Sequence, residues 1–176
     1  MLGTLVRVSA LVAFSGITVN WLPFSSQTYP YTVQQPSSYK HVVIQDISGN
    51  PVDYFFPSLG SWITNVNIYC DHGHLNAAAD LRSVGAKHVH RVARILIDGT
   101  RRTLIRGQFN SIAGRWTEEQ VVFPDHGKVW HLTASYASQF HSQRPIMIKM
   151  LKSFKPNSIG QRTRRHPRGP HTRTGR

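Results

Sequence analysis

Short segments in which apolar and polar residues alternate dominate this sequence and restrict its fold more than any other feature. The clearest pair fills Val89–Arg106 and is divided by Asp98-Gly99, a dipeptide that suits a two-residue type I′ turn. Val42–Ile47 and Val52–Phe56 flank a second turn sequence, Ser48-Gly49-Asn50-Pro51. Successive side chains of a strand point to opposite faces of a sheet, so this period of two predicts antiparallel hairpins.

The remaining segments add one helix and several more strands. Asn76–Val84 is the one good helix, and Gly85 is placed to end it. Pro23–Ser38 is rich in Ser, Gln, Tyr and Pro and is expected to be an extended loop. Further strands are expected over residues 62–70, 120–123, 128–136 and 146–151.

The N-terminus fits two interpretations. Arg7 followed by the apolar run Val8–Phe14 has the form of a secretory signal. The same run alternates, and the alternation resumes over Ile17–Trp21 after Gly16, as in a strand with a bend. We favour the strand and do not expect secretion. No run approaches the roughly 20 apolar residues of a membrane span.

Seven or eight short strands and one helix predict a mainly β fold, or an α+β fold with one short helix. We expect an antiparallel sandwich, barrel or jelly-roll-like single domain over residues 1–151. Residues 152–176 are expected to form a disordered arginine-rich tail, because no large apolar residue follows Ile159.

The net charge of +13 indicates an anionic partner, and the excess is concentrated in the second half of the chain. Residues 1–81 carry two bases and four acids, residues 82–150 carry eleven bases and four acids, and residues 151–176 carry eight bases and no acid. Most of the tail's bases are arginines, which bind phosphate with two hydrogen bonds at once.

The hairpin around Asp98-Gly99 gathers basic residues in a folded segment. A two-residue turn there places Arg91 opposite Arg106, Ile95 opposite Arg102 and Leu96 opposite Arg101. Opposed like charges are unfavourable in a sheet unless an anion binds between them. The candidate nucleic-acid-binding residues are Arg91, Arg94, Arg101, Arg102, Arg106 and Arg115 in and beside the hairpin, and Lys152, Lys155, Arg162, Arg164, Arg165, Arg168, Arg173 and Arg176 in the tail.

Metal and catalytic motifs are weak. Cys70, His72, His74, His88 and His90 offer possible zinc ligands, but their spacing is diagnostic of no zinc fold, so no metal or cofactor is expected. His131-Leu132-Thr133 matches one element of two-histidine phosphoesterases, and the required second element is absent. No nucleophile elbow or phosphate-binding loop is present, and we expect no enzyme.

These features predict a non-enzymatic, nucleic-acid-binding viral structural protein of capsid, nucleocapsid or matrix type. It would be found in the virion or in the host cytoplasm or nucleus. The expected partners are nucleic acid, with RNA favoured over DNA, an anionic membrane surface, and further copies of the chain. The alternatives are a ribosomal or ribonucleoprotein component, a matrix-type protein on an acidic membrane, a silencing suppressor or movement protein, and a phosphoesterase-like enzyme.

Overall fold

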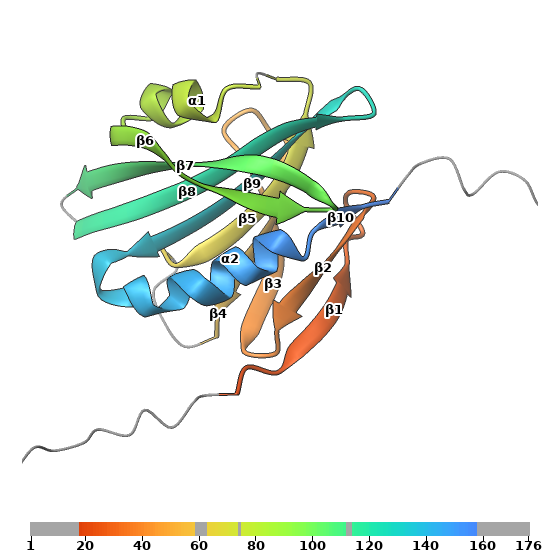
Figure 1. Ribbon diagram of the computed structural model, residues 1–176. Helices are drawn as coiled ribbons and strands as arrows, with labels where there is room; N and C mark the ends of the chain where they lie inside the picture. The colour runs from red at the N-terminus through yellow and green to blue at the C-terminus, as the bar shows by residue number, and fades with distance from the viewer. Residues whose placement is uncertain (1–17, 59–62, 74, 112–113, 158–176) are drawn as a thin grey trace, which may run out of the picture.

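Two antiparallel sheets and two helices make up the part of the chain that the computed structural model describes, residues 18–58, 63–73, 75–111 and 114–157 (Figure 1). The elements are β1 (Trp21–Ser25), β2 (Tyr31–Pro36), β3 (Tyr39–Gln45), β4 (Pro51–Pro57), β5 (Asn65–Asp71), α1 (Ala77–Ser83), β6 (Lys87–Ile97), β7 (Thr100–Ser111), β8 (Gly114–Asp125), β9 (Lys128–Ala137), a 3₁₀ turn (Ser138–Gln143), α2 (Arg144–Lys152) and β10 (Lys155–Pro156). The expected mainly β, two-sheet architecture is confirmed.

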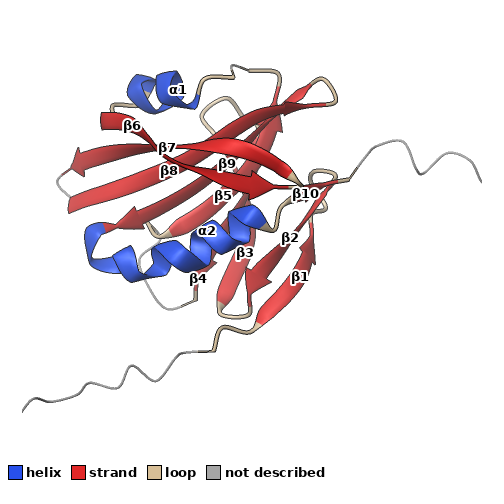
Figure 2. Ribbon diagram, viewed as in Figure 1, coloured by secondary structure: helices blue, strands red, loops and turns tan. Residues whose placement is uncertain are grey.

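The larger sheet has seven strands in the order β3-β4-β5-β9-β8-β7-β6, and the smaller has the order β1-β2-β10. Figure 2 shows the large sheet curving around α2, with the small sheet beside the β3 end. All neighbouring strands are antiparallel. The large sheet therefore ends in two edges, β3 and β6.

The core fills the space between the concave face of the large sheet, α2 and the small sheet. Its centre is an aromatic cluster in which Trp130, Tyr31 and Phe154 are each no more than 2% exposed. The ring centroids of Tyr31 and Phe154 lie 5.1 Å apart, and those of Trp130 and Phe154 lie 5.0 Å apart. Rings of this size dominate core energetics through the apolar area they bury.

Two hairpin turns have positive φ at both central residues, and one of them is the turn predicted at Asp98-Gly99. Asp98 and Gly99 have φ values of 45° and 74°, and His126 and Gly127 have φ values of 47° and 76°. Positive φ at both central residues is the signature of the type I′ turn, whose twist matches that of the flanking strands. The expected helix is also confirmed, since the Asn76 side chain accepts a hydrogen bond from the Ala79 amide at its N-terminus.

The prediction of a strand over residues 146–151 is wrong, because this segment belongs to α2. Pro145 lies in the first turn, where its missing N–H costs no hydrogen bond. Met147, Met150 and Leu151 are completely buried, at the i, i+3, i+4 spacing of a helix face. A run of six residues is too short for its period to separate helix from strand.

Two boundaries also differ from expectation. The predicted loop over Pro23–Ser38 contains part of β1 and all of β2, whose Tyr31 and Val33 are buried by partners far along the chain. The fold continues to Asn157 and buries Phe154 fully, so residues 152–157 do not belong to the tail. The first part of the predicted N-terminal strand, Val8–Phe14, and the tail from residue 158 lie outside the described residues.

A buried carboxylate connects the small sheet to the large one. Asp53 on β4 is fully buried and accepts hydrogen bonds from the Ser26 hydroxyl at 2.5 Å and the Tyr31 hydroxyl at 2.8 Å. Its other oxygen lies 2.7 Å from Nε2 of His41 on β3. Three polar side chains from separate segments thus satisfy one buried acid, as a low-dielectric interior requires.

Replacing Asp53 by alanine should lower the free energy of unfolding by about 3–5 kcal/mol, because it leaves the buried Tyr31 hydroxyl and the partly buried Ser26 and His41 side chains without their partner. Tyr31→Phe removes a single donor and should cost about 1–2 kcal/mol. Urea denaturation of both variants measures the difference. A loss for Asp53→Ala no larger than that for Tyr31→Phe would show that the carboxylate does not hold the two sheets together.

Stability should fall in alkali. Burial raises the pKa of Tyr29 and of Tyr39 to about 12 from 10.0, because it penalises the charged phenolate. The unfolded chain loses these protons first, so stability is complete below pH 10.0 and declines up to about pH 12. Thermal melts across this range measure the decline, and Tyr39→Phe should make it shallower. The prediction would be refuted if the thermal unfolding midpoint were the same at the two ends of this pH range.

Candidate functional site

The basic hairpin of β6 and β7 forms, but its register differs from the expected one at one end. Ile95 lies opposite Arg102 and Leu96 opposite Arg101, as predicted. Beyond Ala93 the register shifts, so that Arg91 faces Ile105 and His90 faces Arg106. The prediction that Arg91 and Arg106 oppose each other is therefore wrong. An extra residue in one strand makes a β-bulge, which composition does not reveal.

Two of the hairpin arginines serve the interior of the protein. Arg106 donates from Nε to the fully buried Glu119 at 2.8 Å, and Arg144 of α2 donates to the same carboxylate at 3.0 Å. The guanidinium of Arg102 lies 4.4 Å from the centroid of the Phe123 ring. The hydrogen bond to Glu119 raises the pKa of Arg144, outweighing the effect of burial, which alone would lower it.

The other predicted binding residues of the folded body are exposed. Arg91, Arg94, Arg101 and Arg115 are exposed on β6, β7 and β8. Lys152 ends α2 and Lys155 begins β10, and both are exposed parts of the folded body. The tail residues Arg162, Arg164, Arg165, Arg168, Arg173 and Arg176 lie outside the described residues.

The possible zinc ligands are not brought together in the part of the chain that is described. Cys70 is 7% exposed and belongs to the core, whereas His72, His88 and His90 are exposed. No three side chains of His, Cys, Asp or Glu converge on one point among the described residues. His74 lies outside them. None of the described helices is both long enough and apolar enough to span a membrane.

His131, the residue of the phosphoesterase-like element, is engaged in the fold. Its side chain is 5% exposed and stacks on Tyr69 with ring centroids 4.6 Å apart. Nε2 lies 3.2 Å from the Asp71 carboxylate, and Nδ1 lies 3.9 Å from that of Asp80. A buried, stacked and paired imidazole is held in place by its neighbours rather than presented to a substrate.

A cleft of about 280 Å³ opens at the end of the sheets where the β3–β4 and β8–β9 turns meet. It is lined by Tyr29, Asn50, Pro51, Cys70, Asp71, His72 and Lys128. The Tyr29 hydroxyl donates to the Pro51 carbonyl, and Asp71 accepts from the Gly73 amide. Burial raises the pKa of the Cys70 thiol, which disfavours the nucleophilic thiolate.

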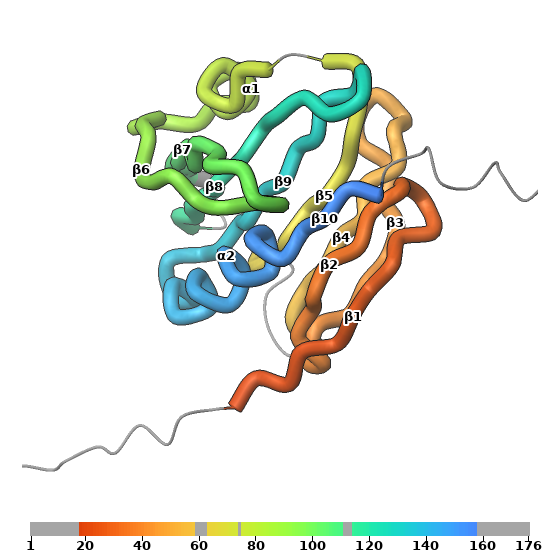
Figure 3. The backbone as a smooth tube through the Cα atoms, turned by 45° about the vertical axis from the view of Figure 1, so that its right-hand side comes forward, coloured from red at the N-terminus to blue at the C-terminus, as the bar shows by residue number. Residues whose placement is uncertain are grey.

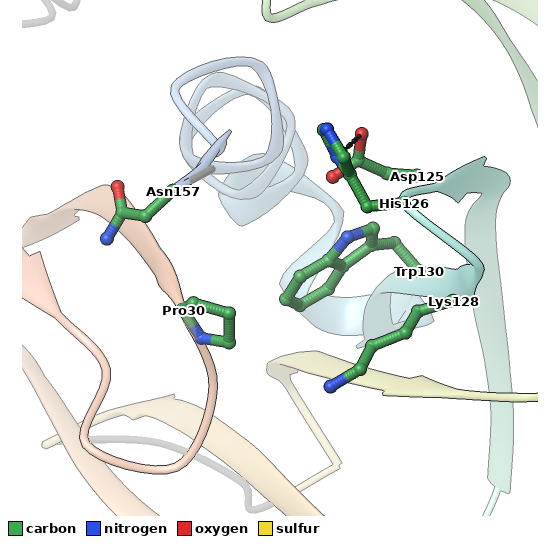
Figure 4. Close-up of a pocket in the computed structure, with 6 residues that line it drawn as sticks. All are labelled: Pro30, Asp125, His126, Lys128, Trp130 and Asn157. Carbon is green, nitrogen blue, oxygen red and sulfur yellow. Dashed lines mark hydrogen bonds and ion pairs between the residues drawn. The ribbon is translucent and has the colours of Figure 1, made fainter. Parts of the chain in front are cut away.

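A second hollow adjoins this cleft on the other side of Lys128 and is lined by Pro30, Asp125, His126, Lys128, Trp130 and Asn157. Figure 4 shows Pro30 and Asn157 on one side of it and His126, Trp130 and Lys128 on the other. Its volume of about 10 Å³ is close to the space of one water molecule. In the second hollow, Nδ1 of His126 lies 2.8 Å from the Asp125 carboxylate, so these two side chains are paired with each other (Figure 4).

The most unusual surface among the described residues is the open edge of β3. Val42, Val43 and Ile44 are consecutive and are 41%, 51% and 42% exposed, although β-branched side chains of this size usually find cover in a sheet. They lie on the last strand of the seven, and Figure 3 shows β3 beside β4 at the end of the large sheet. Sequence reasoning found the strand but not its exposure.

The opposite edge, β6, is protected. Lys87, His88, His90, Arg91 and Arg94 are exposed along it, and the bulge interrupts its pairing geometry. Charged side chains and bulges are the usual means by which an edge strand avoids pairing with another chain. β3 has only Lys40 for this purpose, at its beginning. The sheet therefore has one protected edge and one open edge.

The odd-numbered residues of β3 present their backbone groups to the open side. The Asp46 amide donates to the Asn50 carbonyl, and the Ser58 amide donates to the Ser38 carbonyl. These bonds place the even-numbered residues toward β4, since an antiparallel ladder alternates. The N–H and C=O groups of His41, Val43 and Gln45 therefore point away from β4, and no strand lies beyond them in the described part of the large sheet.

Comparison with protein-family models gives no match, and neither does comparison with curated proteins. Among solved structures, a crystal structure from Bacteroides thetaiotaomicron superposes with a TM-score of 0.53 at 12% identity. The superposition covers 79% of this chain and 49% of that one, so this chain spans about half the length of that protein. A likeness at this identity shows the fold alone.

Two named structures also match. The solution structure of cyanobacterial PsbP from Synechocystis sp. PCC 6803 has a TM-score of 0.47 at 14% identity and covers 84% of this chain and 99% of that one. The crystal structure of LpqN of Mycobacterium tuberculosis, described as involved in cell envelope biogenesis, has a TM-score of 0.48 at 10% identity and covers 80% and 92%.

The functional prediction made from the sequence is not upheld by these comparisons. None of the structures named above is described as a capsid, nucleocapsid, matrix or ribosomal protein. The prediction of a nucleic-acid-binding viral structural protein is wrong, and so are its ribonucleoprotein, acidic-membrane matrix and silencing-suppressor or movement-protein alternatives. Part of the physical reason is visible in the hairpin, where Arg106 neutralises a buried carboxylate.

Mutation can distinguish an arginine that pairs with a buried acid from one that is exposed on the same strand. Arg106→Gln leaves Glu119 with one cation in a buried site and should lower the free energy of unfolding by about 3 kcal/mol. Arg101→Gln on the same strand is exposed and should change it by no more than about 0.5 kcal/mol. Urea denaturation of the two variants gives the comparison. Equal effects would mean that Arg106 has no special structural role.

Proposed function

We propose that this protein is a non-enzymatic polypeptide-binding subunit whose working surface is the open edge of β3. A partner segment in extended conformation would add a strand beside β3. Strand addition of this kind obtains affinity from main-chain hydrogen bonds and specificity from alternate side chains. The observation that carries the proposal is the set of backbone groups at His41, Val43 and Gln45 that point to the open side between exposed apolar side chains.

The chemistry of the edge indicates what kind of segment would bind. Val42 and Ile44 lie on the convex face, where they are paired with Tyr54 and Val52 of β4. Val43 lies on the concave side, paired with Asp53. A matching strand would be apolar at three successive positions, because each of these side chains leaves water only if an apolar neighbour covers it.

The described polar groups support binding rather than catalysis. The buried acids Asp53 and Glu119 are each satisfied by partners within the fold. Burial raises the pKa of Glu118 as well, and the Trp116 and Ser135 side chains hydrogen-bond to it. Groups arranged in this way hold elements together, and the remaining surface feature that calls for a partner is the open edge.

Binding of a short peptide tests the proposal. A labelled, end-blocked peptide with the sequence of residues 39–46 should bind the wild-type protein, as measured by fluorescence anisotropy. Val43→Pro should weaken binding by at least about tenfold. It removes an N–H that points outward and not into the β3–β4 ladder, and proline is tolerated at such edge positions. The urea midpoint of this variant checks that it is folded.

A lysine variant provides a second test and a matched control. Val43→Lys keeps the backbone N–H but places a charge on the edge, and it should also weaken binding. Val84→Lys adds the same charge to an apolar residue that is 64% exposed at the end of α1, away from β3, and it should leave binding unchanged. A peptide that fails to bind the wild type, or that binds all three proteins equally, would refute the proposal.

A further inference from the structure

We infer that the strand added to β3 is β3 of a second copy of this chain, in an antiparallel arrangement about a two-fold axis through Val43. This inference rests on the proposed function and names its partner. Isologous contacts of this kind bring the same surface of both subunits together, so the surface must be complementary to itself. The sequence of β3 meets that condition.

The side chains of two such strands match along their whole length. With Val43 opposite its own copy, Val42 of one chain lies opposite Ile44 of the other. Lys40 of each chain then lies opposite Asp46 of its partner. Asp46 is well suited to receive a cation, since hydrogen bonds from the Asn50 side chain and from backbone amides keep its pKa low, although burial opposes them. Opposite charges facing each other favour this register, and like charges would oppose it.

Neighbouring registers lose this complementarity. Moving the axis to Val42 places Lys40 opposite Ile44, and moving it to Ile44 places Val42 opposite Asp46. In each shifted register a charged side chain lies opposite an apolar one. The charged group is then partly desolvated without gaining an oppositely charged partner. Among the two-fold arrangements of this strand, the one centred on Val43 pairs apolar with apolar residues and base with acid.

The backbone groups are also satisfied in this register. His41, Val43 and Gln45 direct their N–H and C=O groups to the open side, as the bonds of Asp46 and Ser58 indicate. Val43 would exchange both bonds with its own copy, and His41 would exchange both with Gln45 of the partner. Every outward group of these residues then has a partner, and the two seven-stranded sheets become one.

The charges of the molecule favour this edge over the other one. Along β6 most of the exposed residues are basic, so two copies would repel each other there. Along β3 one base and one acid lie at opposite ends of a neutral segment. A single pair of strands buries little surface by the standards of stable complexes, so the dimer should dissociate on dilution in the micromolar range.

Sedimentation velocity of the full-length protein across a dilution series tests the partner. The wild type should shift from dimer to monomer as the concentration falls, and Val84→Lys should behave in the same way. Val43→Pro and Val43→Lys should raise the dissociation constant at least about tenfold. A protein that is monomeric at all concentrations but still binds the 39–46 peptide would overturn the inference and leave the proposed function standing.

Cross-linking tests the register. In a Cys70→Ser background, Val42→Cys and Ile44→Cys chains should form a disulfide when mixed, because residues 42 and 44 would be direct non-hydrogen-bonded neighbours. Either variant alone should stay reduced, since identical positions would be diagonal to each other and roughly 7–8 Å apart. Cross-linking of either variant alone, or none in the mixture, would overturn the register.

Hydrogen exchange tests whether another segment of the same chain occupies the open edge of β3. The amides of His41, Val43 and Gln45 should exchange rapidly in dilute protein and slowly in concentrated protein. Slow exchange of these amides in the dilute monomer would show that the chain covers its own edge, with residues 1–17 as the candidate segment. That result would overturn the inference.

Discussion

The whole arrangement depends on the way in which Asp53 is buried. Its carboxylate is completely enclosed and takes hydrogen bonds from Ser26 and Tyr31, which belong to the segment around the small sheet. It also holds the imidazole of His41, a residue of the edge strand itself. A buried acid left without these partners would be strongly destabilising, so these hydrogen bonds favour the observed packing of the small sheet against β3 and β4. The contact between His41 and Asp53 thus connects the edge strand β3 to the core.

The two edge strands of the large sheet, β3 and β6, differ in how well they are protected from pairing with another chain. Every open sheet leaves unpaired N–H and C=O groups along its outer strands. On β6 the solution is basic side chains and a bulge, and on β3 apolar side chains remain at the surface. A protein that needed to avoid association would protect both edges. The asymmetry is the reason for placing the functional surface on β3 and not on the more conspicuous basic hairpin.

Much of the fold could be predicted from the sequence, and the failures have specific causes. The turns at Asp98-Gly99 and His126-Gly127 are local, so their residues determine them. The expected loop over Pro23–Ser38 and the expected strand over residues 146–151 are wrong because Tyr31 and Met147 are buried by segments far along the chain. The positions of the basic residues follow from the sequence, but their contacts with Glu119 and Phe123 inside the fold do not. The number of charged residues in each segment does not show that Arg106 forms an ion pair with the buried Glu119.

The sequence by itself determined most of the strands and the positions of the hairpin turns, and it placed Val42, Val43 and Ile44 in one of these strands. Only the tertiary structure decided that this strand is the last of its sheet and has no neighbour on its outer side. The reason is that strand order and burial depend on contacts between distant segments, whereas alternation and turn chemistry act over a few residues. A run of three apolar residues can belong to a buried central strand or to an exposed edge strand, and the run itself does not distinguish the two.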